Sequence, residues 1–309
     1  MFDVFKNAWK VEDIREKLLY TLLIIVVFRL GAAIPVPFLD TTALSSMFGA
    51  NSGNLLGYLN MLTGGALSMA TVFALSISPY ITASIVIQLL TIAIPALEKL
   101  AKEGAEGKKK INMITRCSTV ALALIQAYAY YVTLKGYNAV ATFDNTWENV
   151  LVVVTILFMF TAGSMLVMWL GERITDYGVS NGISMLIFAG IIATAGTAIT
   201  GQISGIGVDS VSNKLEVWQL ICFIVIAILV FAAIVTVDSA ERKIPVQYAK
   251  QVKGRKMYGG SSTNIPIKVN SSGVMPLIFA FAILSFPELI MNIFGLGAGN
   301  GFYDWWTKW

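Results

Sequence analysis

Residues 238–270, DSAERKIPVQYAKQVKGRKMYGGSSTNIPIKVN, form a basic, polar loop between two long apolar segments. The loop carries seven lysines and arginines, and its only acidic residues are Asp238 and Glu241. Most multi-span membrane proteins join neighbouring helices by short turns, so a basic loop of this length indicates a surface on which something large and anionic docks. A positive-inside topology signal without any partner would carry the same charges, and the loop alone fits both interpretations.

The composition of the whole chain is that of a membrane protein. It is 56% hydrophobic and 13% charged, with a mean hydropathy of +0.73 and a net charge of +4. Soluble domains carry about 25% charged residues. Histidine is absent, which excludes histidine-based triads and metal sites, and Cys117 and Cys222 show neither metal-ligand nor disulfide spacing. We therefore predict an all-α polytopic membrane protein with no catalytic residues, no metal and no cofactor.

Seven apolar runs are long enough to cross about 30 Å of hydrocarbon. They are residues 18–36, 69–97, 111–134, 150–170, 183–200, 217–237 and 274–294. Of the 22 lysines and arginines, 18 fall at the N-terminus or in alternate loops on one side of these runs. The positive-inside rule makes that side cytoplasmic, so the N-terminus is predicted to be cytoplasmic and the end of the seventh run to lie outside.

Two of the runs are interrupted. Residues 76–81, SISPYI, place Pro79 within the second run, where proline kinks or breaks a helix. The glycine-rich segment 53–66 just before it is too polar to span, and we expect a loosely held element that re-enters the protein from outside. Residues 271–276 interrupt the seventh run in the same way. Paired breaks indicate a functional centre between inverted halves, although prolines are also common in membrane helices without such a role.

Isoleucines lie at helical spacing beside the breaks. Ile77 and Ile81 are four residues apart, as are Ile187 and Ile191, and Ile278 follows Pro276. Each pair shares one helix face. Facing inward together, these side chains would form a narrow apolar constriction that blocks ions by dewetting, whereas single pairs of this kind also face lipid or an ordinary core.

Three long motifs carry a resemblance to a known family. They are GGALSMATVFALSISPYITASIVIQLL at 64–90, WLGERITDYGVSNGISMLIFAGI at 169–191 and ERKIPVQYAKQVKGRKMYGGSSTNIPIKVNSSGVMPLIFA at 241–280. With these motifs the chain resembles the SecY family, the channel subunits of the bacterial protein-conducting translocon, over nearly its whole length.

The resemblance implies roles for particular residues. A re-entrant plug helix would occupy about 54–74, with Asn54, Leu62, Gly64 and Gly65. The pore ring would comprise Ile77, Ile81, Ile187, Ile191 and Ile278. The second and seventh spans would line a lateral gate towards lipid, with Gln88, Gln126 and Asn270 near it. Docking of the ribosome and of SecA would fall on Arg242, Lys243, Lys250, Arg255 and Lys256.

The resemblance also implies an organisation and a set of partners. The family has ten spans in two inverted halves of five. Residues 1–205 would therefore be the N-terminal half with the plug, and 206–309 a partial C-terminal half with two spans and the docking loop. The last three spans are then expected to be missing from this chain. The implied partners are SecE, SecG, the SecA ATPase, the ribosome, nascent secretory and membrane proteins, and the lipid of the bacterial cytoplasmic membrane.

Three functions compete at this point: a protein-conducting channel, a secondary transporter of the inverted-repeat type, and a membrane scaffold or intramembrane enzyme. A transporter should bury ionisable groups at the midplane, and the runs are nearly free of them. Arg29, Arg116 and Glu288 are the arginine and acidic residues within the runs. We expect Arg29 to reach the outer headgroups, with Glu288 as an alternative partner. No catalytic set is visible, and without a nucleotide-binding motif the chain cannot power transport alone.

Overall fold

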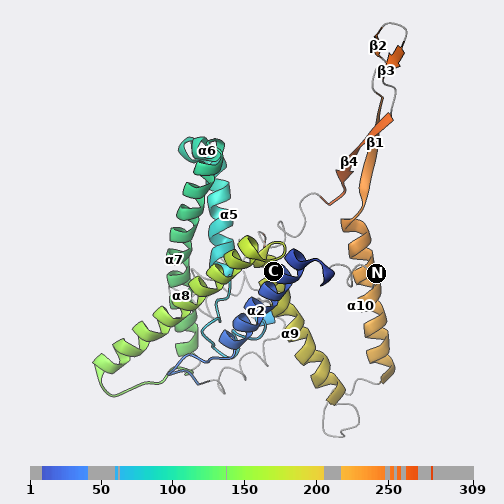
Figure 1. Cartoon of the computed structure of the whole chain (residues 1–309). Coiled ribbons are helices and arrows are strands. Elements are labelled where there is room, and N and C mark those ends of the chain that lie inside the picture. Colours follow the sequence, from blue (N-terminus) through green and yellow to red (C-terminus); the bar gives the residue numbers. More distant parts are fainter. Residues whose placement is uncertain are drawn as a thin grey trace, which may run out of the picture. The chain divides into compact units, whose positions relative to one another are not determined.

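The computed structural model describes residues 9–40, 60–61, 63–136, 138–204, 217–247, 251–253, 256–258, 262–270 and 280. The chain divides into two compact units, one of Met1–Ala198 with Ala282–Trp309 and one of Ile199–Phe281. Helices of the first unit are α2 (Glu12–Gly31), α5 (Ser78–Ala93), α6 (Pro95–Lys102), α7 (Ala105–Gly136), α8 (Thr146–Tyr177) and most of α9 (Gly182–Ser204), shown in Figure 1. The predicted helical class is confirmed.

The helices follow the predicted apolar runs as far as the described residues extend. Among these residues, α7, α8 and Ile221–Asp238 of helix α10 are long and apolar enough to cross a membrane, and α5 with α6 adds one broken span. The apolar part of α9, Gly182–Thr197, is shorter. The first apolar run, 18–36, overlaps α2 over 18–31 and continues beyond the end of that helix. The seventh run, 274–294, lies almost entirely outside the described residues.

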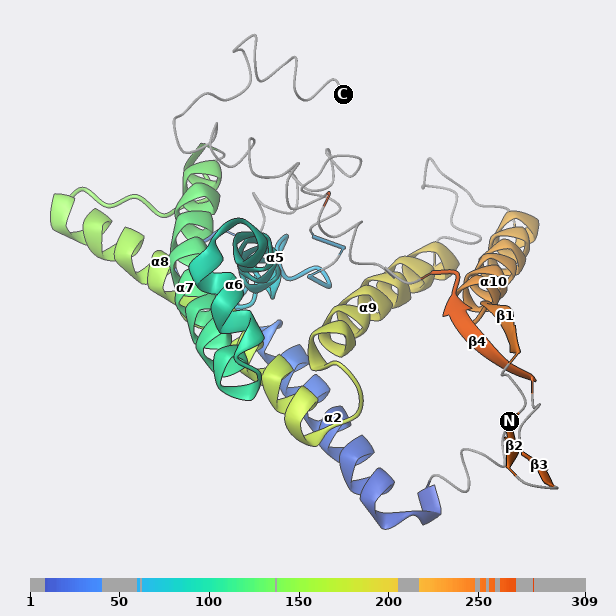
Figure 2. The ribbon, with the colours of Figure 1, turned by 90° about the horizontal axis from the view of Figure 1, so that it is seen from above.

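Two prolines set the limits of α5. Pro79 occupies its first turn, where a missing N–H costs nothing, so the helix begins at Ser78 and not at residue 69 as predicted. Pro95 forces the preceding Ile94 out of the helical region, to φ −106° and ψ 113°. The chain then bends by 102° into α6, which crosses the end of α5 and α7 (Figure 2).

Residues 63–77, which we call the turn segment, include the last part of the predicted plug helix, 54–74, and lead into α5 by successive turns and not by a helix. Backbone hydrogen bonds fix the segment to the end of the first run: Val36 N donates to Ala70 O over 3.0 Å and Val72 N to Ile34 O over 3.0 Å. Ala66, Ala70 and Ala74 are at most 1% exposed. Ala66 belongs to the segment 53–66 that we expected to be loosely held, and that expectation is wrong at this residue, because small alanines let the turns pack closely inside the unit.

Two apolar clusters enclose the turn segment. One joins it to α7 and α8, where the ring of Tyr130 lies 5.3 Å from that of Phe160 and its hydroxyl donates to Leu67 O over 2.7 Å. The other, which we call the isoleucine cluster, joins the turn segment to α2, α5, α8 and α9. Its buried members are Ile24, Phe28, Ala32, Ala66, Phe73, Ile77, Val167, Leu170, Ile174 and Leu186, and Tyr20, Val72, Tyr80, Ile81, Ile183 and Ile187 pack against them.

The second unit contains α10 (Val217–Asp238) and two antiparallel ribbons (Figure 1). Strand β1 (Glu241–Gln247) pairs with β4 (Ser262–Lys268), and β2 (Gln251–Lys253) pairs with β3 (Lys256–Tyr258). The basic loop thus contains strands, which the sequence analysis did not predict. The alternation in 241–247 and 262–268 was the available signal, and a two-stranded ribbon tolerates Pro245 and Pro266 because both of its strands are edges.

Candidate functional site

The isoleucine cluster is the place where the predicted pore residues come together. Ile77 is 3% exposed at the start of α5, and Ile81 N donates to Ile77 O over 3.1 Å, which places both side chains on one face. Ile187 on α9 packs against the same cluster. Three side chains predicted from spacing on two separate helices therefore share one apolar contact region.

Side chains from the start of α5 and from α9 both approach Gly171 of α8. A Cβ placed on Gly171 would lie 3.4 Å from Ile183, 3.5 Å from Ile77 and 3.5 Å from Leu186. These distances are ordinary van der Waals contacts, so the cluster has room for a methyl group at this point of α8.

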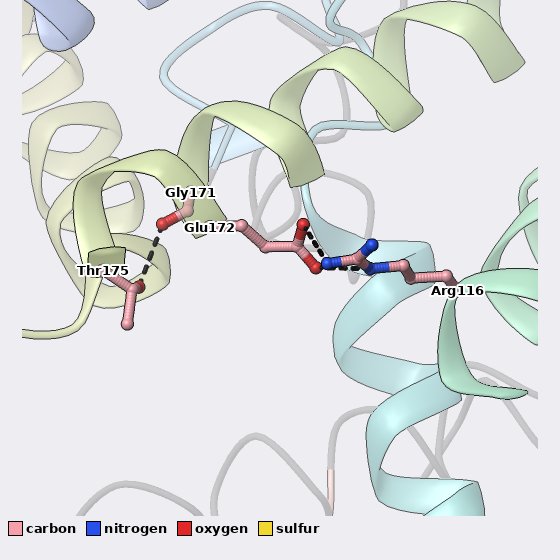
Figure 3. Close-up of polar contacts among 4 residues, drawn as sticks. All are labelled: Arg116, Gly171, Glu172 and Thr175. Atoms are coloured by element: carbon pink, nitrogen blue, oxygen red, sulfur yellow. Dashed lines mark hydrogen bonds and ion pairs between the residues drawn. The ribbon is translucent and has the colours of Figure 1, made fainter. Parts of the chain in front are cut away.

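A threonine fixes the turn from α8 to α9. The Thr175 hydroxyl donates to Gly171 O over 3.0 Å, as Figure 3 shows, and accepts from Gly182 N over 3.0 Å. At Gly182 an added Cβ would meet Gly171 O at 2.0 Å, so the first turn of α9 sits directly on α8. This contact between the first turn of α9 and α8 fixes the positions of Ile183 and Ile187 in the cluster.

Of the two remaining predicted pore-ring residues, one is partly exposed and the other lies outside the described residues. Ile191, one turn beyond Ile187, is 36% exposed, and Ile278 lies outside the described residues. The structure therefore gathers Ile77, Ile81 and Ile187 and leaves Ile191 at the margin. The ring itself stays a prediction.

Of the predicted plug, about 54–74, the structure describes residues 60–61 and 63–74. Asn54 and Leu62 lie outside the described residues. Gly64 and Gly65 have φ of 72° and 84°, values that favour glycine, and they turn the chain before Ala66 enters the cluster. Gly64 lies against Arg29 of α2, whose guanidinium donates to the carbonyls of Ala189 and Gly190. The expectation that Arg29 reaches the headgroups is therefore wrong, because α9 offers it backbone acceptors.

The predicted gate residues fall on three elements. Gln88 is exposed on α5, and Gln126 is half-buried on α7, which packs along α5. Asn270 lies in the second unit, where its amide donates to Asp238 Oδ1 over 3.3 Å and so links the two ends of the basic loop. This pairing was not foreseen from the sequence.

The basic residues of the loop lie along the ribbons. Arg242 and Lys243 are exposed on β1, opposite Ile267 and Pro266 of β4. Lys253 and Lys256 are register partners in the second ribbon. Lys250 and Arg255 lie outside the described residues.

An ion pair that the sequence analysis did not predict joins α7 to α8. Arg116 donates from Nε to Glu172 Oε1 over 2.9 Å, and its Nη2 lies 2.8 Å from Glu172 Oε2 (Figure 3). This two-point geometry is the arrangement in which arginine binds a carboxylate most specifically. Its two residues lie 56 positions apart, so no local pattern pointed to it. Among the described residues, no group of histidine, cysteine or acidic side chains could hold a metal ion.

Comparison with known proteins gives the family. The family model described as SecY matches residues 71–308. The "Protein translocase subunit SecY" of Streptomyces scabiei is 42% identical over the whole chain and that of Thermotoga maritima 41% identical over 95% of it. The chain spans 70% and 67% of these two relatives.

Solved structures show the same fold. "The structure of a protein conducting channel" superposes with a TM-score of 0.57 at 19% identity, covering 92% of this chain and 60% of that one. "Sec61 in the Canine ribosome-channel complex from the endoplasmic reticulum" superposes with a TM-score of 0.55 at 18% identity, covering 92% and 60%. With the family model matching most of its length and relatives above 40% identity, the chain belongs to the SecY family.

Proposed function

We propose that this chain forms the central part of a protein-conducting channel, which passes unfolded polypeptides across the membrane and releases apolar segments sideways into lipid. The observation that carries the proposal is the convergence of Ile77, Ile81 and Ile187 on one cluster. The SecY relatives and the superposed channels support this function, and they do not support the alternative of a secondary transporter.

The chemistry of the cluster suits such a passage. A translocating chain presents side chains of every kind, so a throat that bound any of them strongly would stall it. Branched aliphatic side chains give a deformable seal without hydrogen-bonding groups, and a dry apolar constriction excludes ions. An apolar segment that leaves towards lipid gains about 0.8 kcal/mol for each buried methylene. Gln88, Gln126 and Asn270 are proposed to lie near the exit.

The setting and the partners belong to the same proposal. The charge distribution and the bacterial relatives support a bacterial cytoplasmic membrane with the N-terminus inside. Energy would come from the SecA ATPase or from synthesis on the ribosome, both docking on the basic ribbons, with SecE and SecG as companion subunits. The ribosome-bound state of a superposed channel supports the ribosome as a partner.

The test is cross-linking to a stalled secretory polypeptide in the full-length protein with its companion subunits. Cysteine at Ile81 should cross-link to the stalled chain. The matched control is cysteine at Phe158, an apolar α8 residue that is 67% exposed and outside the cluster. Equal cross-linking at both positions, or cross-linking at Phe158 alone, would remove the proposed passage from the isoleucine cluster.

A further inference from the structure

Arg29 holds α2 and α9 together from inside the first unit. Its Nη2 donates to the carbonyl of Ala189 and, over 3.2 Å, to that of Gly190. Phe28, the residue before it, is 1% exposed and stacks on Phe73 of the turn segment at 5.7 Å, so the α2 backbone beneath Arg29 is fixed. A half-buried guanidinium bound to two helix carbonyls is a strong, directed contact, because one partner is charged.

The predicted plug rests on this same contact. A Cβ on Gly64 would lie 2.8 Å from Nη1 of Arg29 and 3.1 Å from the Cα of Gly190, so the Gly64 backbone touches both the guanidinium and α9. A second bond lies beside it: the Thr194 hydroxyl donates to Met61 O over 3.3 Å. The end of the plug is thus held at two points of α9.

The geometry is consistent along both helices. Near its middle, α2 meets the turn before α9, where Val179 N donates to Thr21 Oγ1 over 3.1 Å. Arg29 lies two turns further along α2, and Gly190 about two turns into α9, so the two helices run in the same direction. The Arg29 contact therefore joins two helices that run in the same direction and links them to the plug.

We propose that Arg29 is a positioning residue that keeps the plug seated against α9 in the resting channel. The inference rests on the proposed function and names the side chain that regulates it. Displacing the plug removes the Gly64 backbone from Arg29 and separates Met61 from Thr194. Loss of the guanidinium should therefore make the resting channel open more often.

The test measures ion permeation of the resting full-length protein with its companion subunits in lipid vesicles. Arg29→Met should raise the permeation at least about tenfold, which corresponds to about 1.4 kcal/mol in the opening equilibrium. Arg29→Lys should give a smaller rise, because an ammonium cannot span two carbonyls. Thr194→Val, which removes the hydroxyl that donates to Met61 O and to Gly190 O, should also leak. Arg15→Met is the control, since it removes the same side chain from the exposed end of α2. Wild-type permeation in the Arg29 variants and in Thr194→Val overturns the proposal.

A reversible disulfide between the plug and α9 tests whether Arg29 acts through the plug. With Cys117 and Cys222 replaced by serine, Met61→Cys and Thr194→Cys are oxidised to a disulfide in the Arg29→Met protein. The disulfide should return permeation to the wild-type level, and reduction should restore the leak. A leak that persists in the oxidised protein overturns the proposal. The wild type should open when a secretory polypeptide engages it, and failure of that separate control would instead remove the channel function.

Discussion

Gly163 and Gly171 of α8 both contact the turn segment before α5. An added Cβ would meet its nearest neighbour at a different distance in each case. A Cβ on Gly163 would lie 1.9 Å from Val72 O, a backbone atom that cannot move aside alone. At Gly171 the nearest atoms are side-chain carbons at 3.4 Å or more, an ordinary contact. The turn segment is therefore fitted to α8 most tightly at Gly163, while the isoleucine cluster has room for one methyl group at Gly171.

This difference predicts opposite outcomes for one substitution. Gly163→Ala should destabilise the protein by about 1–3 kcal/mol, because the turn segment must shift. Gly171→Ala should be neutral or stabilising by up to about 1 kcal/mol, since alanine favours helix over glycine. Thermal unfolding in detergent measures both variants, and equal losses of stability would contradict the packing described for Gly163.

Single residues were predictable where the signal was local. The four-residue spacing of Ile77 and Ile81 placed both on one face, and Ile187 joined them as expected. Arg29 was misjudged because its acceptors are backbone carbonyls 160 positions away, and such groups leave no mark in a sequence. The hydrogen bonds of Thr175 to Gly171 and Gly182 were not predicted, because they depend on a turn that the sequence alone does not indicate.

At the scale of elements, the apolar runs predicted the helices and proline predicted the break before α5. The predicted extent of helix in the second apolar run was wrong, since residues 69–77 are apolar but fold as turns and not as helix. Composition cannot separate the two, because a buried turn needs the same small apolar residues as a membrane helix. The strands of the basic loop were not predicted, because the loop was interpreted by its charge and not by the alternation of its side chains.

The ribbons carry a prediction of their own. Reversing charge with Arg255→Glu and Lys256→Glu should weaken ribosome and SecA binding, because the tip loses cations that suit RNA phosphates and acidic protein surfaces. Ribosome binding by the wild type should fall steeply with salt, and the variant should show a shallower slope. Co-sedimentation across a salt series measures this.

The matched control for charge is Lys99→Glu with Lys102→Glu on α6. It makes the same change of charge on the same predicted side of the membrane, away from the ribbons. Equal losses of binding in the two double variants would show a general electrostatic effect, and unchanged binding of the tip variant at low salt would defeat the docking role.

At the scale of the molecule, the first unit brings α2, α5, α8 and α9 around one apolar region, and the turn segment runs through it. The sequence predicted a constriction of isoleucines beside paired interruptions in two runs, and three of these residues, Ile77, Ile81 and Ile187, lie in one apolar cluster of the first unit. Ile278 lies outside the described residues, so the constriction and the inverted pairing of the two halves stay predictions.

The central claim is that the isoleucine cluster must part for a polypeptide to pass. In the full-length protein, without its native cysteines, Ile81→Cys and Ile187→Cys can be joined by a short bifunctional thiol reagent and translocation measured before and after the link is cleaved. The account predicts that bridging stops translocation and that cleavage restores it. Translocation at the wild-type rate through fully bridged protein would contradict it.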